Sequence, residues 1–318
     1  MNSSKTYTEM QSEYMSNLRN FCFPILNQME VKRKVLYLIF VITLPLAILS
    51  IVGLIIIGIM KEERLISFTP IMMLFSMLVL LTYSIISKNF ENSVKKQIMP
   101  ILCKAIGNIS WAQSPMISHD LYVNSYILHS RFDKVEVDDV FKGSYKDVNY
   151  NIVEARYFKK EVRHTKEGRK TEYVNIFNGL LITLDMNKNF NSHTVVKTNM
   201  LGRFLTNNEL KHTVLEDIEF EKKFDVLTND EVEARYLLTT SFMEKLKNLQ
   251  MSFRASFIEY AFYQDKMIIA FDSLPNMFHV GSIWKSLIDE RQYFQMFEEI
   301  LSIIKLIDYF KLDQKIGL

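Results

Sequence analysis

The densest group of side chains able to do chemistry lies at 230–236, where acids, an arginine and a tyrosine follow one another. Carboxylates beside a cation can transfer protons or hold a charged ligand, so Glu233, Arg235 and Tyr236 are the candidate binding residues here. The same residues also suit a helix start, because acids favour a helix N-terminus and Glu231 lies four positions before Arg235. This structural interpretation explains most of the stretch and is favoured.

A second group of charges is basic and surrounds Gly168. It lies between two stretches rich in β-branched and aromatic residues, 148–165 and 171–186, so we expect it at the tip of a long β-hairpin. Such a tip could contact lipid phosphates or a nucleic acid, although most tips of this kind are solvated hairpin ends. The candidate binding residues at this tip are Arg163, Arg169 and Lys170.

Motifs for established chemistry are missing from the sequence. With Gly 9 in the whole chain, there is no phosphate-binding glycine loop, and neither a nucleophile elbow nor a zinc-binding H-E-x-x-H helix occurs. Cys22 and Cys103 are the only cysteines and do not form a Cys-x-x-Cys pair. The histidines are isolated from one another, at His119, His129, His164, His193, His212 and His279. We therefore assign no catalytic residue, metal or cofactor, and the chain is favoured as a non-enzyme.

Two long apolar stretches, 35–59 and 65–86, carry no charged residue. A bilayer core about 30 Å thick requires roughly 20 apolar residues in a helix, so each stretch is long enough to span it. Pro45 should bend the first helix without breaking it, and Pro70 lies near the start of the second. The sequence predicts a transmembrane hairpin over 35–87.

The charges that flank the hairpin predict its orientation. Before the first span lie Lys5, Arg19, Lys32, Arg33 and Lys34, and after the second lie Lys88, Lys95, Lys96 and Lys104. The connecting loop carries Lys61 and Arg64 beside two glutamates. By the positive-inside rule, both termini are cytoplasmic and the chain is a two-pass protein of a bacterial cytoplasmic (inner) membrane.

We expect the first span to be retained, because the polar segment 1–34 precedes it. Tyr37 and Tyr83 lie near the cytoplasmic ends of the spans without forming a clear aromatic belt.

The segments next to the membrane have helical spacing. Within the cytoplasmic segment 1–34, apolar residues at helical spacing between 10 and 29 predict a short amphipathic helix leading to the membrane. In the juxtamembrane segment 88–110, a stalk helix is predicted by a four-residue repeat, which Pro100 should kink or end. The repeat consists of Phe90, Val94, Ile98 and Leu102.

The remainder, 111–318, is predicted to be one cytoplasmic α+β domain with helices packed on a mostly antiparallel sheet. Strand patterns dominate 111–213, and a further hairpin is expected around the turn Gln264 to Lys266. Thr228 and Glu231 fit a capping box that would begin a helix, and the tail from 283 to 312 favours one or two amphipathic helices.

Two blocks of residues resemble those of a known family. The first block contains Phe220, Phe224, Asp225, Val226, Asp230, Glu233, Ala234, Arg235, Tyr236 and Leu237, and the second contains Phe177, Gly179 and Leu180. They resemble a bacterial membrane family, domain-of-unknown-function family 3137, in which a transmembrane hairpin and a strand-rich middle precede the first block. The resemblance implies architecture and location, supplies no catalytic residue, and suggests a LemA-type membrane protein as a partner.

Two functions fit these observations. The first is an interaction or scaffold module held at the inner face of the membrane, whose partner is a membrane protein or a second copy of the chain. The alternative is a membrane-surface enzyme or lipid-binding regulator acting on lipid or envelope components. A channel is disfavoured because the spans lack charge, and nucleic-acid binding because the net charge is only +2.

Overall fold

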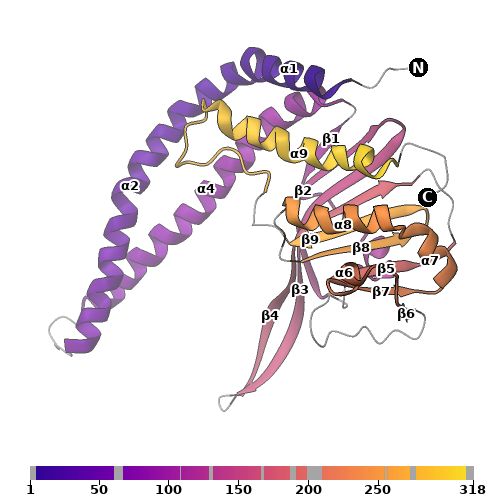
Figure 1. The fold of residues 1–318 in the computed structure, drawn as a ribbon. Helices are drawn as coiled ribbons and strands as arrows, with labels where there is room; N and C mark the ends of the chain where they lie inside the picture. Colours follow the sequence, from indigo (N-terminus) through magenta and orange to yellow (C-terminus); the bar gives the residue numbers. More distant parts are fainter. Residues whose placement is uncertain are drawn as a thin grey trace. The chain divides into compact units, whose positions relative to one another are not determined.

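A computed structural model of the chain contains two compact units (Figure 1). The sheet unit comprises Met1–Met10, Ile106–Phe278 and Met296–Leu318, and the helical unit comprises Gln11–Ala105 and His279–Gln295. The structure describes residues 5–60, 67–107, 109–128, 132–165, 168–186, 191–198, 210–253, 255, 257–272 and 277–312.

Two long helices dominate the helical unit. The first begins as α1 (Tyr7–Asn17), passes through the π-helical turn η1 (Leu18–Cys22) and continues as α2 (Phe23–Met60). The second is α4 (Thr69–Ala105). Pro24 directly follows the π-helical turn, where the ladder of backbone hydrogen bonds is already shifted, and α2 also continues through Pro45. The segment predicted to lead to the membrane therefore joins the apolar stretch as one helix.

The polar ends of these helices share a buried apolar seam. Tyr14, Leu18, Cys22 and Leu26 recur every four residues along the first helix, and all four are buried. The repeat predicted on the stalk, Phe90, Val94, Ile98 and Leu102, is buried as well. Because η1 contacts α4, the two rows form a core that joins the helices at this end.

The sheet unit is built on one antiparallel sheet, which confirms the predicted α+β class. Its described strands follow the order β1-β2-β3-β4-β9-β8-β5-β7-β6. They are β1 (Ser110–Gln113), β2 (Lys134–Tyr145), β3 (Val148–Thr165), β4 (Gly168–Asp185), β5 (Thr194–Thr198), β6 (Lys211–Thr213), β7 (Phe224–Thr228), β8 (Ile258–Tyr263) and β9 (Lys266–Asp272). The helices outside α1, α2 and α4 are α5 (Asp120–Asn124), α6 (Ile218–Glu221), α7 (Glu231–Leu237), α8 (Thr240–Phe253) and α9 (Glu290–Phe310).

Both predicted hairpins are confirmed. Strands β3 and β4 pair from Tyr150 opposite Leu184 outward to Thr165 opposite Gly168. Strands β8 and β9 are joined by Gln264 and Asp265, which both adopt left-handed backbone angles, with φ of 52° and 55°. Two successive left-handed residues match the twist of a two-residue hairpin loop.

The predicted capping box is wrong by two residues. Asp230, rather than Thr228, is the N-cap, and its carboxylate accepts hydrogen bonds from the amides of Val232 and Glu233 at 2.9 and 3.0 Å. A short aspartate side chain reaches these amides readily, whereas Thr228 lies in strand β7. The helix expected beyond 231 is also divided, into α7 and α8.

Apolar residues fill both faces of the sheet. On one face, Tyr122 and Ile127 from the segment around α5 pack in a buried cluster with Tyr157, Val195 and other strand residues. On the opposite face lies α8 (Figure 1). There the ring of Phe242 is 5.8 Å from that of Phe262 of β8 and 4.9 Å from that of Phe310 of α9. The sheet is therefore the middle layer of the unit.

Gly179 is required where β4 approaches β9. A Cβ atom at this position would lie 2.0 Å from the backbone oxygen of Phe271, which cannot move without breaking the strand pairing. We expect Gly179→Ala to lower the free energy of unfolding of the sheet unit by about 2 kcal/mol or more, as measured by urea denaturation of the detergent-solubilised protein. Gly58→Ala is the matched control, because its Cβ would meet nothing within 4 Å. Equal denaturation midpoints would contradict this explanation of Gly179.

Candidate functional site

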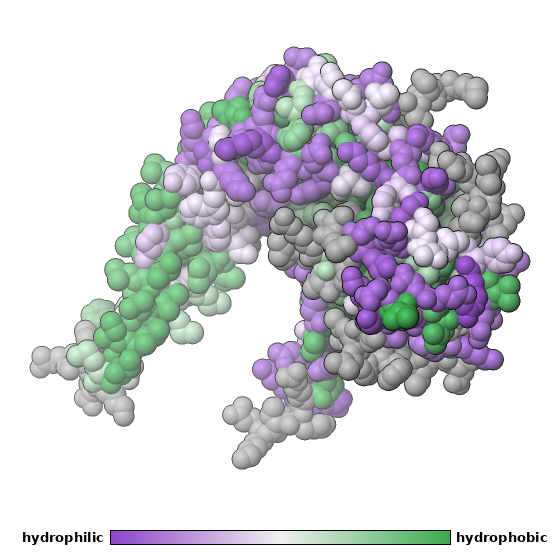
Figure 2. All heavy atoms as spheres, viewed as in Figure 1, coloured by the Kyte–Doolittle hydropathy of each residue, from purple (hydrophilic) through white to green (hydrophobic). Residues whose placement is uncertain are grey.

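The outer surface of the helical hairpin is apolar and exposed. Both long helices are long and apolar enough to cross a membrane, and only 11% of the most apolar stretch of each is buried. A buried core helix of a soluble protein would have the opposite pattern. Figure 2 shows this part of the helical unit as a continuous hydrophobic surface. Among the exposed residues are Leu46, Leu49, Ile55, Leu74 and Leu78.

Small and polar side chains lie on the inner side of the hairpin. Ala47 and Ser50 are buried on α2, and the Ser50 hydroxyl donates to the carbonyl of Met72 on α4 at 3.0 Å. At Gly53, a Cβ would lie 2.7 Å from the terminal methyl group of Met72, so the helices approach closely there. Small residues and an interhelical hydrogen bond inside, with large apolar residues outside, are typical of helix pairs packed in lipid.

An aromatic group lies at the polar end of this apolar surface. Trp284 donates its indole N–H to the Tyr83 hydroxyl at 2.8 Å, and its ring is 5.7 Å from that of Tyr37. Phe40 packs edge-on against Tyr83, with ring centroids 5.0 Å apart. Tyr37 and Tyr83 were noted from the sequence, whereas Trp284 was missed because it is about 200 residues from Tyr83 in the chain. We call Tyr37, Tyr83 and Trp284 the aromatic collar.

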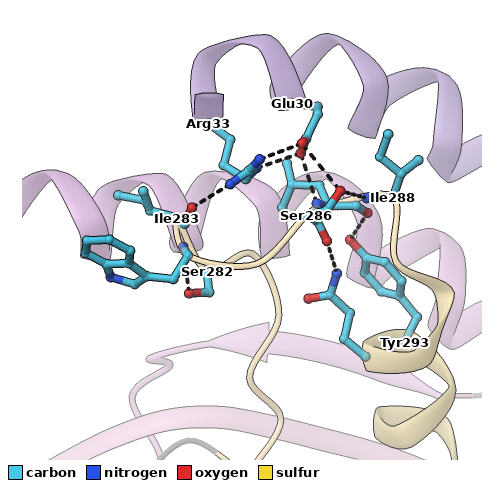
Figure 3. A network of polar contacts seen from close by, with 10 residues as sticks. Glu30, Arg33, Ser282, Ile283, Ser286, Ile288 and Tyr293 are labelled. Atoms are coloured by element: carbon cyan, nitrogen blue, oxygen red, sulfur yellow. Dashed lines mark hydrogen bonds and ion pairs between the residues drawn. The ribbon is translucent and has the colours of Figure 1, made fainter. Parts of the chain in front are cut away.

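A buried ion pair on α2 holds the segment that carries Trp284 (Figure 3). Glu30 and Arg33 form two hydrogen bonds of 2.8 Å. Arg33 also donates to the carbonyl of Ile283 at 2.8 Å, and Glu30 accepts from the amide of Leu287 at 2.9 Å. The Ser286 hydroxyl lies 3.4 Å from Glu30. This polar clamp, Glu30 and Arg33 with 283–287, fixes an irregular segment on both sides of Trp284.

The charge state of Glu30 follows from these contacts. Burial raises the pKa of its carboxyl group, but the hydrogen bonds from Arg33 and from the Leu287 amide outweigh this effect. The pKa of Glu30 therefore lies below its ordinary value, and the clamp contains a carboxylate at neutral pH. Tyr14 adds a further bond just beyond this segment, in the first turn of α9, by donating to the carbonyl of Tyr293 at 2.9 Å.

The acid–base candidates on α7 have mainly structural contacts. Glu233 accepts from the amides of Asn191 and Ser192 and thus joins α7 to the residues before β5. Arg235 donates to the carbonyl of Val214 at 2.9 Å, a partner other than the expected Glu231. Tyr236 is different, because 67% of it is exposed. Arg235 is exposed as well, but its guanidinium group bonds within the protein, so Tyr236 is the candidate of this group that offers an exposed aromatic ring.

The basic candidates lie elsewhere in the sheet unit, at the end of the β3–β4 hairpin. Arg163 pairs with Lys170 across the two strands, and Arg169 follows the tip. Arg169 and Lys170 are exposed, whereas the side chain of Arg163 lies outside the described residues, as does Lys166. Because β4 and β7 are separated by three strands, the fold does not bring this group together with α7 (Figure 1).

Carboxylates from β2 and β3 form an acidic cluster that the sequence did not suggest. One oxygen from each of Asp138, Asp139 and Glu154 lies within 4.8 Å of the others, and the last two residues are buried. A register shift between Val137 and Val140 places the two aspartates at a β-bulge. Oxygen ligands of this kind suit a hard cation such as Mg²⁺ or Ca²⁺. However, Asp139 already accepts from the Trp111 indole and Glu154 from the Met277 amide, so both have structural partners.

A buried ion pair joins β5 to β8. The Lys197 ammonium group lies 2.8 Å from the Glu259 carboxylate and 3.2 Å from the carbonyl of Ile127. Burial lowers the pKa of Lys197 below its ordinary value, against the opposite effect of Glu259. Both side chains are satisfied within the protein, so the geometry favours a structural pair.

Comparison with known families confirms the predicted resemblance. The family described as "Protein of unknown function (DUF3137)" matches residues 175–312. The match begins in β4 and includes β5 to β9 and α6 to α9, and it therefore contains both Tyr236 and Trp284. The match begins after both apolar helices, the second of which ends at Ala105. It therefore does not cover the hairpin.

Other comparisons are more distant. No curated protein shows significant sequence similarity to the chain. Among solved structures, the chain is similar to the mycobacterial trehalose monomycolate transport factor A, TtfA, with 10% sequence identity and a TM-score of 0.32. The aligned part covers 64% of this chain and 90% of that protein. At this level of similarity, neither a fold nor a function is transferred.

Proposed function

We propose that the chain is a membrane-anchored protein whose hairpin, α2 with α4, crosses the bacterial cytoplasmic membrane, and whose sheet unit is an interaction module at the inner face. The observation that carries this proposal is the exposed apolar surface of the hairpin. Lipid is the environment that stabilises such a surface, and the closed backbone bonding of helices suits it. Neither membrane anchoring nor binding of a protein partner requires a metal or cofactor.

The orientation is supported by the lengths of the helices and by their charges. At about 1.5 Å per residue, α2 and α4 are each longer than a bilayer core about 30 Å thick, and their extra length lies at the ends away from the connecting loop. Those ends carry Lys32, Lys34 and Lys88, all exposed. The positive-inside rule assigns this side to the cytoplasm.

The orientation can be tested with introduced cysteines, because Cys22 and Cys103 are buried. A membrane-impermeant maleimide should label Glu62→Cys in intact spheroplasts, and should label Tyr236→Cys only after permeabilisation. The full chain should also stay with the membrane through an alkaline wash and be released by detergent. Release by alkali alone would contradict anchoring, and labelling of Tyr236→Cys in intact spheroplasts would reverse the orientation.

The interaction module is supported by apolar residues that gather on α6, α7 and their flanks. Exposed here are Val214, Ile218, Val232 and Tyr236, with the last two one helical turn apart. Figure 2 shows hydrophobic patches among hydrophilic surface on the sheet unit. Exposed apolar groups of this kind mark contact sites, and tyrosine is enriched at the centres of interfaces. The expected partner is a membrane protein, for which a LemA-type protein is the first candidate, or a second copy of the chain.

A photo-crosslinking amino acid at position 236 tests this surface. We expect one discrete adduct in native membranes, and Val232→Asp on the same helix face should remove most of it. Tyr173 is the matched control, since it is also an exposed tyrosine but lies on the β3–β4 hairpin. Adducts of equal yield at both positions, or at neither, would contradict a docking surface on α7.

A further inference from the structure

The segment 282–288 has properties that its polar clamp does not explain. It contains Trp284 and Ile288, two large apolar side chains that are 43% and 40% exposed. The clamp bonds are made by the buried neighbours Ile283 and Leu287, so the chain is held while Trp284 faces outward. A clamp needs neither an exposed tryptophan nor an exposed isoleucine.

The depth of Trp284 along the hairpin is fixed by its partners. Tyr37 lies two residues inside one apolar stretch, and Tyr83 three residues inside the end of the other. Trp284 contacts both rings and donates to the Tyr83 hydroxyl. All three residues belong to the helical unit, so they share one level at the boundary between apolar and charged surface. Amphipathic rings at such a boundary are characteristic of the lipid headgroup region.

Exposed lysines lie at the same level of the hairpin as the aromatic collar. Lys285 follows Trp284 directly and is exposed, and Lys32, Lys34 and Lys88 are exposed on the adjoining helix turns. Lysines at the cytoplasmic boundary attract anionic headgroups, each contributing roughly 1 kcal/mol near a charged surface. Aromatic, aliphatic and cationic side chains thus occur together where headgroups would meet the hairpin.

We propose that 282–288 is an interfacial lipid-binding element, in which Trp284 inserts among phospholipid headgroups and Lys285 contacts their phosphates. The proposal rests on the membrane-spanning role of α2 and α4. It adds a third membrane contact, contributed by a segment nearly 200 residues after the second span. Through the clamp, this contact ties the part of the chain that enters α9 to the bilayer surface.

Tryptophan fluorescence can test the element, because Trp111 and Trp284 are the only tryptophans. Full-length Trp111→Phe protein would be placed in vesicles of phosphatidylcholine and phosphatidylglycerol whose acyl chains carry bromine either near the headgroup or near the chain middle. Trp284 should be quenched about twofold more by the shallow bromines than by the deep ones. Should Trp111→Phe misfold, the difference between the parent protein and Trp284→Phe gives the same signal.

A second reporter separates failure of this element from failure of the anchor. Leu46 is exposed near the middle of the first apolar stretch, so Leu46→Trp in a background lacking both native tryptophans should be quenched best by the deep bromines. Deep quenching at position 46 without shallow quenching of Trp284 would overturn the lipid-binding element and leave the anchor standing. Absence of quenching at position 46 would overturn both.

The anionic preference has its own readout. At equal mole fraction, brominated phosphatidylglycerol should quench Trp284 more than brominated phosphatidylcholine, and Lys285→Gln should reduce the difference. Equal quenching by the two lipids would overturn the contact with anionic headgroups.

Discussion

Replacing Glu30 with alanine is expected to release the clamped segment 283–287 from α2. The change leaves the Arg33 guanidinium buried without its carboxylate and removes the acceptor of the Leu287 amide. Breaking a buried pair costs about 3 kcal/mol or more, which corresponds to roughly a hundredfold larger population of the released state. Trypsin cleavage after the exposed Lys285 reports this population when opening and closing are fast, so we expect it to be about a hundredfold faster.

Lys222 provides the internal control for the Glu30→Ala experiment, because it is exposed on the sheet unit and should be cleaved at an unchanged rate. Arg33→Met added to Glu30→Ala should recover part of the loss by removing the unpaired charge. The effect should also depend on pH. Since the folded pKa of Glu30 is lowered, its stabilising contribution is complete above the unfolded pKa of about 4.3 and is lost as the pH falls through the folded value. In strong acid, where trypsin is inactive, hydrogen exchange of the Leu287 amide replaces cleavage as the measure of the released state. A Glu30→Ala effect of equal size there would contradict the ion-pair explanation.

Much of the fold could be predicted from the sequence, because it depends on residues close together in the chain. The alternation in β3 and β4 and the turn at Gln264 and Asp265 depend on near neighbours, and both were predicted from the sequence. The apolar stretches and the stalk repeat around Val94 depend on composition and spacing over one helix, which the sequence also contains. Such features require no knowledge of distant contacts.

The collar and the clamp could not be predicted in the same way. Glu30 and Arg33 read as ordinary helix charges near a membrane, and only the fold brings Ile283 and Leu287 to them. Trp284 likewise lies far in the sequence from Tyr37 and Tyr83, the residues that place it beside the apolar surface. On α7 the error was of another kind, because Glu231 and Arg235 have ideal spacing, yet the carbonyl of Val214 binds the guanidinium instead. Tertiary partners decide between such alternatives.

The buried pair between β5 and β8 predicts the second large effect. Replacing Lys197 with methionine removes the cation but leaves the Glu259 carboxylate buried, since only 2% of Glu259 is exposed. We expect the free energy of unfolding of the sheet unit to fall by about 3–5 kcal/mol, because an isolated buried charge is strongly unfavourable. Urea denaturation followed by the fluorescence of Trp111, in protein carrying Trp284→Phe, measures this quantity.

The double variant Lys197→Met with Glu259→Leu distinguishes a costly unpaired charge from lost packing. If the unpaired carboxylate causes the loss, removing it should restore most of the stability, since apolar residues of similar size often replace a buried pair at little cost. Lys222→Met, at the C-cap of α6, is the matched control and should change the free energy of unfolding by less than about 0.5 kcal/mol, because its ion pair is exposed. A double variant no more stable than Lys197→Met alone would mean that the lysine stem and its bond to Ile127, rather than charge pairing, hold β5 against β8.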